Sequence, residues 1–132
     1  MLDHLRQRAV EALSSVHSVT LSTYGAAELQ ASSLPCEAVG LHLYLLLPIP
    51  SDHLLNLENH ADVVVTTPLW QLRGTAVVLE AAACLPRLNL CHKPEAQWSR
   101  LVEIRPSQLN LRHPTKGGLI GWGFSETIDI DT

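Results

Sequence analysis

Residues suited to binding an anion or a cofactor are concentrated in the short stretch Ser51-Asp52-His53. A serine followed by an acidic residue is typical of a helix start, because the serine oxygen caps free backbone N–H groups and the carboxylate favours the positive end of the helix dipole. The same N–H groups can bind a phosphate, with the Ser51 hydroxyl and a protonated His53 as further donors. The alternative is that Ser51 only caps the helix and His53 lies in solvent.

Three further positions have a chemical interpretation and a plainer structural one. Ser32 and Ser33 are neighbours on a predicted strand, so one faces each side of the sheet; they are binding residues or small polar residues on an exposed face. Arg73, beside Gly74, could reach an anionic ligand from a strand, although a surface arginine on a bulge is the favoured interpretation. Trp122, like Trp98, could stack on a planar ring or belong to a core or an interface.

The sequence predicts no metal site. Its seven histidines include no i, i+4 pair, and the three cysteines form no C-x-x-C motif. An odd cysteine count indicates reduced thiols rather than a disulfide framework.

The first residues are mixed in character and lack the apolar core of a signal peptide. We therefore expect a cytoplasmic protein.

Composition limits the possible partners. The chain has 132 residues, of which 46% are hydrophobic and 17% charged, and its net charge is −4. We expect one domain over residues 1–132. The negative charge argues against a nucleic acid or an anionic membrane as partner. The longest apolar run, Leu43–Leu47, is far shorter than the roughly 20 residues that cross a bilayer.

Hydrophobic periodicity predicts a mainly β chain that follows an N-terminal helix over residues 2–16. A proline or a polar turn ends most of the short strands, and one short helix begins at Ser51. Gly74 is expected to mark a bulge, and Pro106 to interrupt a strand. Many short strands at close spacing indicate a barrel or a sandwich. Strands are expected over residues 19–23, 28–36, 41–47, 63–67, 70–83, 101–105 and 108–112, with a further short strand or tail at 128–131.

Several of these segments resemble the pyridoxamine 5'-phosphate oxidase-like family of FMN-binding split β-barrels. The resemblance covers roughly residues 19–130, and each motif is degenerate. It implies a six- or seven-stranded split β-barrel with an N-terminal helix and one short inserted helix. The segments that carry it are Val19–Thr23, Gln30–Pro35, Leu43–Leu47, Ser51-x-His53-x-x-Asn56-Leu57, Val63–Val65, Leu72–Ala76 and Val102–Pro106.

The resemblance also implies a function: a homodimer that binds FMN in a groove between subunits, as a flavin-dependent oxidoreductase whose substrate the sequence does not name. Because obligate dimers bury apolar surface, the high apolar content fits a large subunit interface. Ser51 and His53 would then contact the phosphate. The other implied FMN-binding residues are Ser32, Ser33 and Leu34 along the ring, with Leu47, Arg73 and the stacking Trp122.

Departures from the family pattern keep other cofactors open. Where His53 stands, the family commonly has a lysine or arginine, and it commonly has a threonine or serine near Leu47-Pro48. A haem-utilisation branch has a similar His-x-x-Asn-Leu run and a glycine-aromatic segment like Gly121–Phe124. The alternatives to FMN are thus haem, a deazaflavin, or a cofactor-free dimer whose flavin site has decayed.

Overall fold

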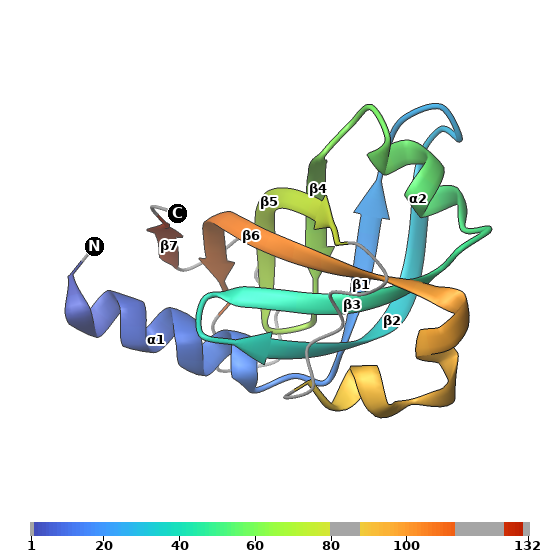
Figure 1. Cartoon of the computed structure of the whole chain (residues 1–132). Coiled ribbons are helices and arrows are strands. Elements are labelled where there is room, and N and C mark those ends of the chain that lie inside the picture. Colours follow the sequence, from blue (N-terminus) through green and yellow to red (C-terminus); the bar gives the residue numbers. More distant parts are fainter. Residues whose placement is uncertain (1, 80–87, 113–125, 131–132) are drawn as a thin grey trace.

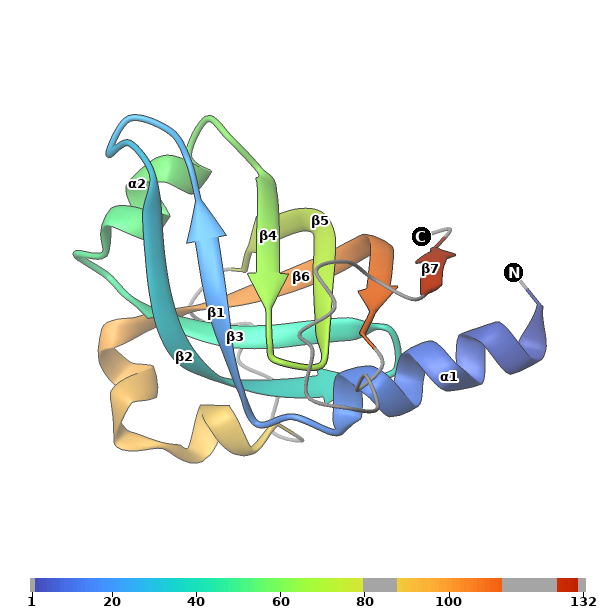
Figure 2. The same ribbon diagram turned by 180° about the vertical axis from the view of Figure 1, so that it is seen from behind.

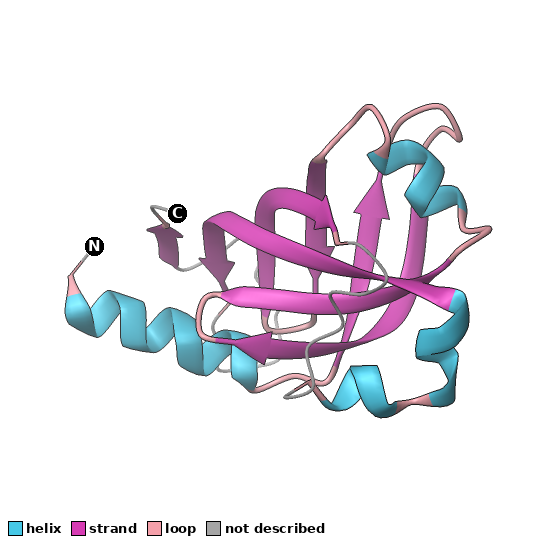
Figure 3. Ribbon diagram, in the orientation of Figure 1, coloured by secondary structure: helices cyan, strands magenta, loops and turns pink. Residues whose placement is uncertain are grey.

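The computed structural model describes residues 2–79, 88–112 and 126–130, which form a strongly curved β-sheet flanked by short helices (Figures 1 and 3). In chain order the elements are α1 (Asp3–Ser14), β1 (Ser18–Thr23), β2 (Gln30–Val39), β3 (His42–Pro48), α2 (Asp52–Leu57), β4 (Asp62–Thr66), β5 (Trp70–Val78), the 3₁₀ helices η2 (Asn89–His92) and η3 (Pro94–Trp98), β6 (Ser99–Leu111) and β7 (Glu126–Asp129).

The sheet closes into a six-stranded barrel. Its strand order is β3-β2-β1-β4-β5-β6-β7, and β3 also pairs with β6. Closure depends on the long β6, which pairs with β3 near its start and with β5 along most of its length. β7 lies outside the closed ring and adds to the end of β6. The expectation of a mainly β split barrel with an N-terminal helix and one short inserted helix is confirmed.

The barrel interior is filled by alternate residues of each strand, as a period of two requires. Along β1, for example, Val19, Leu21 and Thr23 are buried, whereas the residues between them are half-buried on the outer face. Leu43 and Leu47 on β3 are fully buried in the same core. Aliphatic side chains thus specify the register, because a slip of one residue would turn them to solvent.

α1 packs against this core through its predicted apolar stripe. Ala9 and Leu13 are fully buried, and the indole N–H of Trp70 donates to the Ala12 carbonyl at 3.0 Å. This bond joins the last turn of α1 to the first residue of β5. Neither this helix nor any other in the described ranges is long and apolar enough to span a membrane.

The segment that contains η2 and η3 covers part of the outside of the barrel. Leu88 and Leu90 pack there against Tyr44 of β3 and Leu101 of β6, forming a second, smaller apolar cluster.

Cys91 in η2 is disulfide-bonded, so the expectation of reduced thiols is wrong for this residue. Cys36 is a free thiol, and burial raises its pKa to about 11.

Two prolines lie inside strands, although the sequence predicts a strand edge or end close to Pro35 and a strand break at Pro106. Pro35 is the last residue of β2 to pair with β1, and pairing with β3 begins at Cys36, so the missing N–H falls where the strand changes partner. Pro106 lies opposite Gly74, at a shift of register between β5 and β6. The predicted bulge at Gly74 is confirmed, and it lets β6 continue through Pro106.

Candidate functional site

The start of α2 is organised by Ser51, as the sequence predicts. The Ser51 side-chain oxygen accepts a hydrogen bond from the backbone N–H of His53 at 3.1 Å, which caps the helix. Asp52 occupies the first turn and is exposed. The helix has only six residues, so its dipole is small.

His53 faces inward, and its side chain connects α2 to two strands. Its Nδ1 lies 2.8 Å from Thr23 Oγ1 on β1, and its Nε2 lies 2.9 Å from Ser32 Oγ on β2. The residue is only 4% exposed. Burial lowers the pKa of His53, although the negative charge of Asp52 partly opposes the shift. A neutral ring suits this position, because it accepts at one nitrogen and donates at the other.

Because of these contacts, the start of α2 offers no cationic side chain that could bind a phosphate. Both ring nitrogens of His53 are used inside the protein, and burial keeps the ring neutral. The nearest charged side chain on the helix is the carboxylate of Asp52, which repels an anion. Phosphate carries close to two negative charges and requires charge-assisted donors. The residues at this helix start therefore do not fit the phosphate of FMN.

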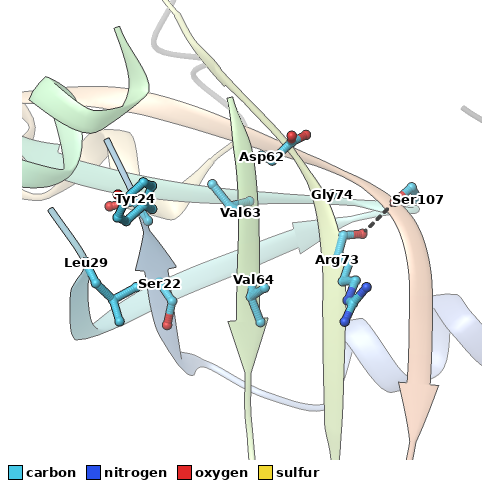
Figure 4. Close-up of a pocket in the computed structure, with 10 residues that line it drawn as sticks. Ser22, Tyr24, Leu29, Asp62, Val63, Val64, Arg73, Gly74 and Ser107 are labelled. Atoms are coloured by element: carbon cyan, nitrogen blue, oxygen red, sulfur yellow. Dashed lines mark hydrogen bonds between the residues drawn. The ribbon is translucent and has the colours of Figure 1, made fainter. Parts of the chain in front are cut away.

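A pocket of about 450 Å³ lies on the other side of β1, on the outer face of the sheet. Figure 4 shows its floor, which is made by adjacent strands β1, β4 and β5, and Figure 2 shows the same strands from outside the barrel. Its volume falls within the range of about 300–1,000 Å³ that is usual for small-molecule sites. It is lined by Ser22, Thr23, Tyr24, Leu29, Asp62, Val63, Val64, Arg73, Gly74 and Ser107.

The β-bulge forms one end of this pocket. Ser107 is the extra residue on β6, between the pairs Gly74–Pro106 and Arg73–Gln108. Its hydroxyl donates to the Arg73 carbonyl at 3.1 Å. A Cβ at Gly74 would lie 2.4 Å from the Arg105 carbonyl oxygen, so only glycine permits this close approach. Bulges redirect neighbouring side chains, and here the residue next to the bulge is Arg73.

Arg73 gives the pocket its positive charge. The side chain is exposed, and within the described ranges no carboxylate forms an ion pair with it. Asp62 lines the same pocket, but in Figure 4 its carboxylate and the Arg73 guanidinium point away from each other. The guanidinium therefore remains available for bidentate contacts with a phosphate or a carboxylate.

The other predicted residues lie apart from this pocket. Ser32 and Ser33 face opposite sides of β2, as predicted: Ser32 contacts His53, and the Ser33 hydroxyl lies 3.5 Å from that of Ser18 on the outer face. Leu34 packs against the barrel core, and Leu47 is buried within it. Trp122 lies outside the described residues.

Several residues that line the pocket are not among the binding residues that the sequence predicts. Tyr24 lies between the expected strands 19–23 and 28–36, Leu29 lies at the start of the second, and Ser107 follows the strand break that Pro106 predicts. The available signal for Ser107 was the pair of Gly74 and Pro106, because a glycine and a proline in adjacent strands mark an irregular pairing. No group of metal-ligating side chains occurs within the described part of the chain.

Comparisons with known proteins support the fold. No protein-family model and no curated protein sequence matches this chain. Solved structures do match: the general stress protein 26 of Bacillus anthracis superposes with a TM-score of 0.68 at 17% identity, covering 96% of this chain and 99% of that one. A Clostridium acetobutylicum protein related to general stress protein 26, of the pyridoxinephosphate oxidase family, gives 0.63 at 14% identity, covering 83% and 89%.

Haem-related structures match as well. HutZ, the haem storage protein of Vibrio cholerae, superposes with a TM-score of 0.58 at 15% identity, covering 83% of this chain and 94% of that one. ChuZ of Campylobacter jejuni gives 0.63 at 16% identity; it covers 99% of this chain, which spans only 61% of ChuZ. At these identities the likeness establishes the fold, and the resemblance to pyridoxamine 5'-phosphate oxidase-like split barrels is confirmed at that level.

Proposed function

We propose that this protein binds FMN in the outer-face pocket, with Arg73 as the partner of the phosphate, and that it serves as a flavin-dependent oxidoreductase. The observation that carries the proposal is an exposed guanidinium, unpaired among the described residues, at the end of a pocket of about 450 Å³. Likeness to pyridoxinephosphate oxidase-family folds supports the choice of a flavin. In this proposal Ser51 and His53 have structural roles.

The chain's own side chains would bind and orient the cofactor. Arg73 offers two parallel N–H donors to a phosphate, and the hydroxyl of Ser22 is a further donor in the same pocket. Tyr24 and Leu29 supply apolar surface for a flat ring. The flavin, when bound, would supply the hydride chemistry.

A second copy of the chain would complete the site. Leu29 is 72% exposed and Tyr24 is 58% exposed, so both side chains present apolar surface to solvent at the rim of the pocket. Neighbouring exposed apolar side chains at a rim are typical of surfaces that associate. A homodimer would cover them and enclose the cofactor between subunits.

Haem is the second candidate, and one contact favours it. Tyr24 on the pocket rim meets His60 edge to face, with ring centroids 5.9 Å apart. Tyrosine and histidine are both axial ligands of haem iron, and the propionates of haem would take the same guanidinium as a phosphate. Likeness to the haem storage protein HutZ supports this alternative.

One experiment tests the proposal and separates the cofactors. The purified protein is titrated with FMN and, separately, with hemin, and flavin fluorescence and Soret absorbance are recorded. Arg73→Gln should weaken FMN binding about tenfold or more, the range for a lost charge-assisted bond. Arg6→Gln, an exposed arginine on α1, is the matched control and should bind as the wild type does.

The outcomes are distinct. Saturable FMN binding that depends on Arg73 supports the proposal. A Soret band that Tyr24→Phe shifts or abolishes, without FMN binding, supports haem instead. A colourless protein that binds neither cofactor overturns both and leaves the cofactor-free dimer.

A further inference from the structure

The side chain of Asn56 in α2 is fully buried and directs its hydrogen bonds at the last residue of β1 and at the segment between β1 and β2. Its Oδ1 accepts from the backbone N–H of Ala27 at 2.8 Å. Its Nδ2 donates to the Glu28 carbonyl at 2.8 Å and to Thr23 Oγ1 at 3.0 Å. One amide thus joins α2 to three points on a segment about thirty residues earlier in the chain.

The hairpin tip is shaped to receive this amide. A Cβ on Gly25 would lie 2.8 Å from Asn56 Cα and 2.9 Å from its carbonyl oxygen, so the backbone there approaches α2 as closely as glycine allows. Glu28 has a φ of 64°, the left-handed conformation that non-glycine residues adopt rarely. The Glu28 N–H donates to the Gly25 carbonyl at 2.9 Å, which closes the turn. This strained turn is held in place by its contacts with Asn56.

The same tip carries the apolar rim of the outer-face pocket. Tyr24 precedes Gly25, and Leu29 follows Glu28, and both side chains line the pocket. Exposed loops are normally mobile, because few contacts hold their backbone. Here the backbone is fixed by a buried amide, whereas the apolar side chains project outward. Such preorganisation reduces the entropy that a binding surface loses on association.

We propose that Asn56 is a positioning residue: it does not line the pocket, but it fixes the backbone that presents Tyr24 and Leu29 to the ligand. This inference rests on the proposed function only for the identity of the ligand. The hydrogen bonds that hold the tip belong to the chain itself, and they are measurable without any cofactor.

The test combines amide exchange with binding. Asn56→Ala should speed hydrogen exchange at Ala27 by about tenfold or more, because its N–H loses its only described acceptor. Exchange in the paired centre of β3 and β6 should stay unchanged. FMN binding should weaken by about three- to tenfold, the factor for a rim that must be ordered on binding. Leu55→Ala, an exposed position on the same helix, is the matched control and should change neither quantity.

Two further variants keep the test decisive if Asn56→Ala unfolds. Asn56→Asp retains the acceptor for Ala27 but loses the donors to Glu28 and Thr23, so it should weaken FMN binding while keeping part of the Ala27 protection. Gly25→Ala disturbs the same contact from the hairpin side and should reproduce the Asn56→Ala pattern.

The outcomes separate this inference from the proposed function. Unchanged Ala27 exchange in the variants overturns the positioning role. Faster exchange with unchanged FMN affinity also overturns it, because Asn56 would then be structural only. If the wild type binds no FMN, the proposed function fails; hemin affinity then replaces FMN affinity, and binding of neither ligand overturns the role at this pocket.

Discussion

Replacing Thr23 with valine tests the buried network that joins α2 to the barrel. The substitution keeps the side-chain shape and removes the hydroxyl. Thr23 is 2% exposed, so water does not replace the lost partner. His53 Nδ1 and one hydrogen of Asn56 Nδ2 would then each lack a partner. A buried unpaired polar group costs about 1–3 kcal/mol, so the two groups together should make Thr23→Val lower the free energy of unfolding by about 2–6 kcal/mol.

Urea unfolding followed by circular dichroism measures this loss, at one fixed protein concentration because the stability of the proposed dimer would depend on concentration. Thr23→Ser is the control: it keeps the hydroxyl and loses a methyl group, worth about 0.8 kcal/mol. The wild type should be the most stable, Thr23→Ser should be less stable, and Thr23→Val should be the least stable. A Thr23→Val protein at least as stable as Thr23→Ser would refute the account of this network.

Three further predictions concern pH, the bulge and association. Burial lowers the pKa of His53 from 6.5, so the unfolded chain takes up the proton first as the pH falls. The free energy of unfolding should therefore decrease below about pH 6.5, and His53→Gln should flatten this part of the profile; equal slopes would contradict the assignment. Gly74→Ala should destabilise by about 1–3 kcal/mol, because its Cβ meets the Arg105 carbonyl at 2.4 Å; an unchanged unfolding midpoint would argue against the bulge. Leu29→Asp should reduce the molecular mass measured by light scattering from that of the proposed dimer to that of a monomer. A monomeric mass for the wild-type protein would contradict the proposed dimer.

Local chemistry made much of the fold predictable. The alternation in residues 19–23 and the apolar run from Leu43 identify strands without any knowledge of their partners. Ser51 was predicted as a helix cap because capping involves only residues next to it in sequence. Gly74 predicts a bulge because a glycine weakens the interior of a strand and often marks a bulge or a bend there.

The candidate site was less predictable, because it depends on contacts between distant residues. The direction in which His53 faces is decided by Thr23 and Ser32, 30 and 21 positions away. The sequence showed a histidine near a helix start, but not that its ring would be turned inward and kept neutral. The pocket likewise joins strands whose lateral order, β1-β4-β5, no local pattern specifies.

The course of β6 illustrates the same limit. Pro106 alone predicts a strand break, since proline donates no hydrogen bond to a neighbouring strand. The strand continues because Gly74 on β5 lets the two backbones approach and Ser107 is looped out as the extra residue. This arrangement depends on residues of both β5 and β6, so the sequence of β6 alone does not predict that the strand continues through Pro106.

The most direct test of the central claim is to follow backbone amide resonances of the ¹⁵N-labelled protein while FMN is added. Binding in the outer-face pocket predicts the largest shifts at Ser22, Tyr24, Gly74 and Ser107. The amides of Asp52 and His53 at the start of α2 should change little. Largest shifts at the start of α2, or no shifts at saturating FMN, would contradict the account.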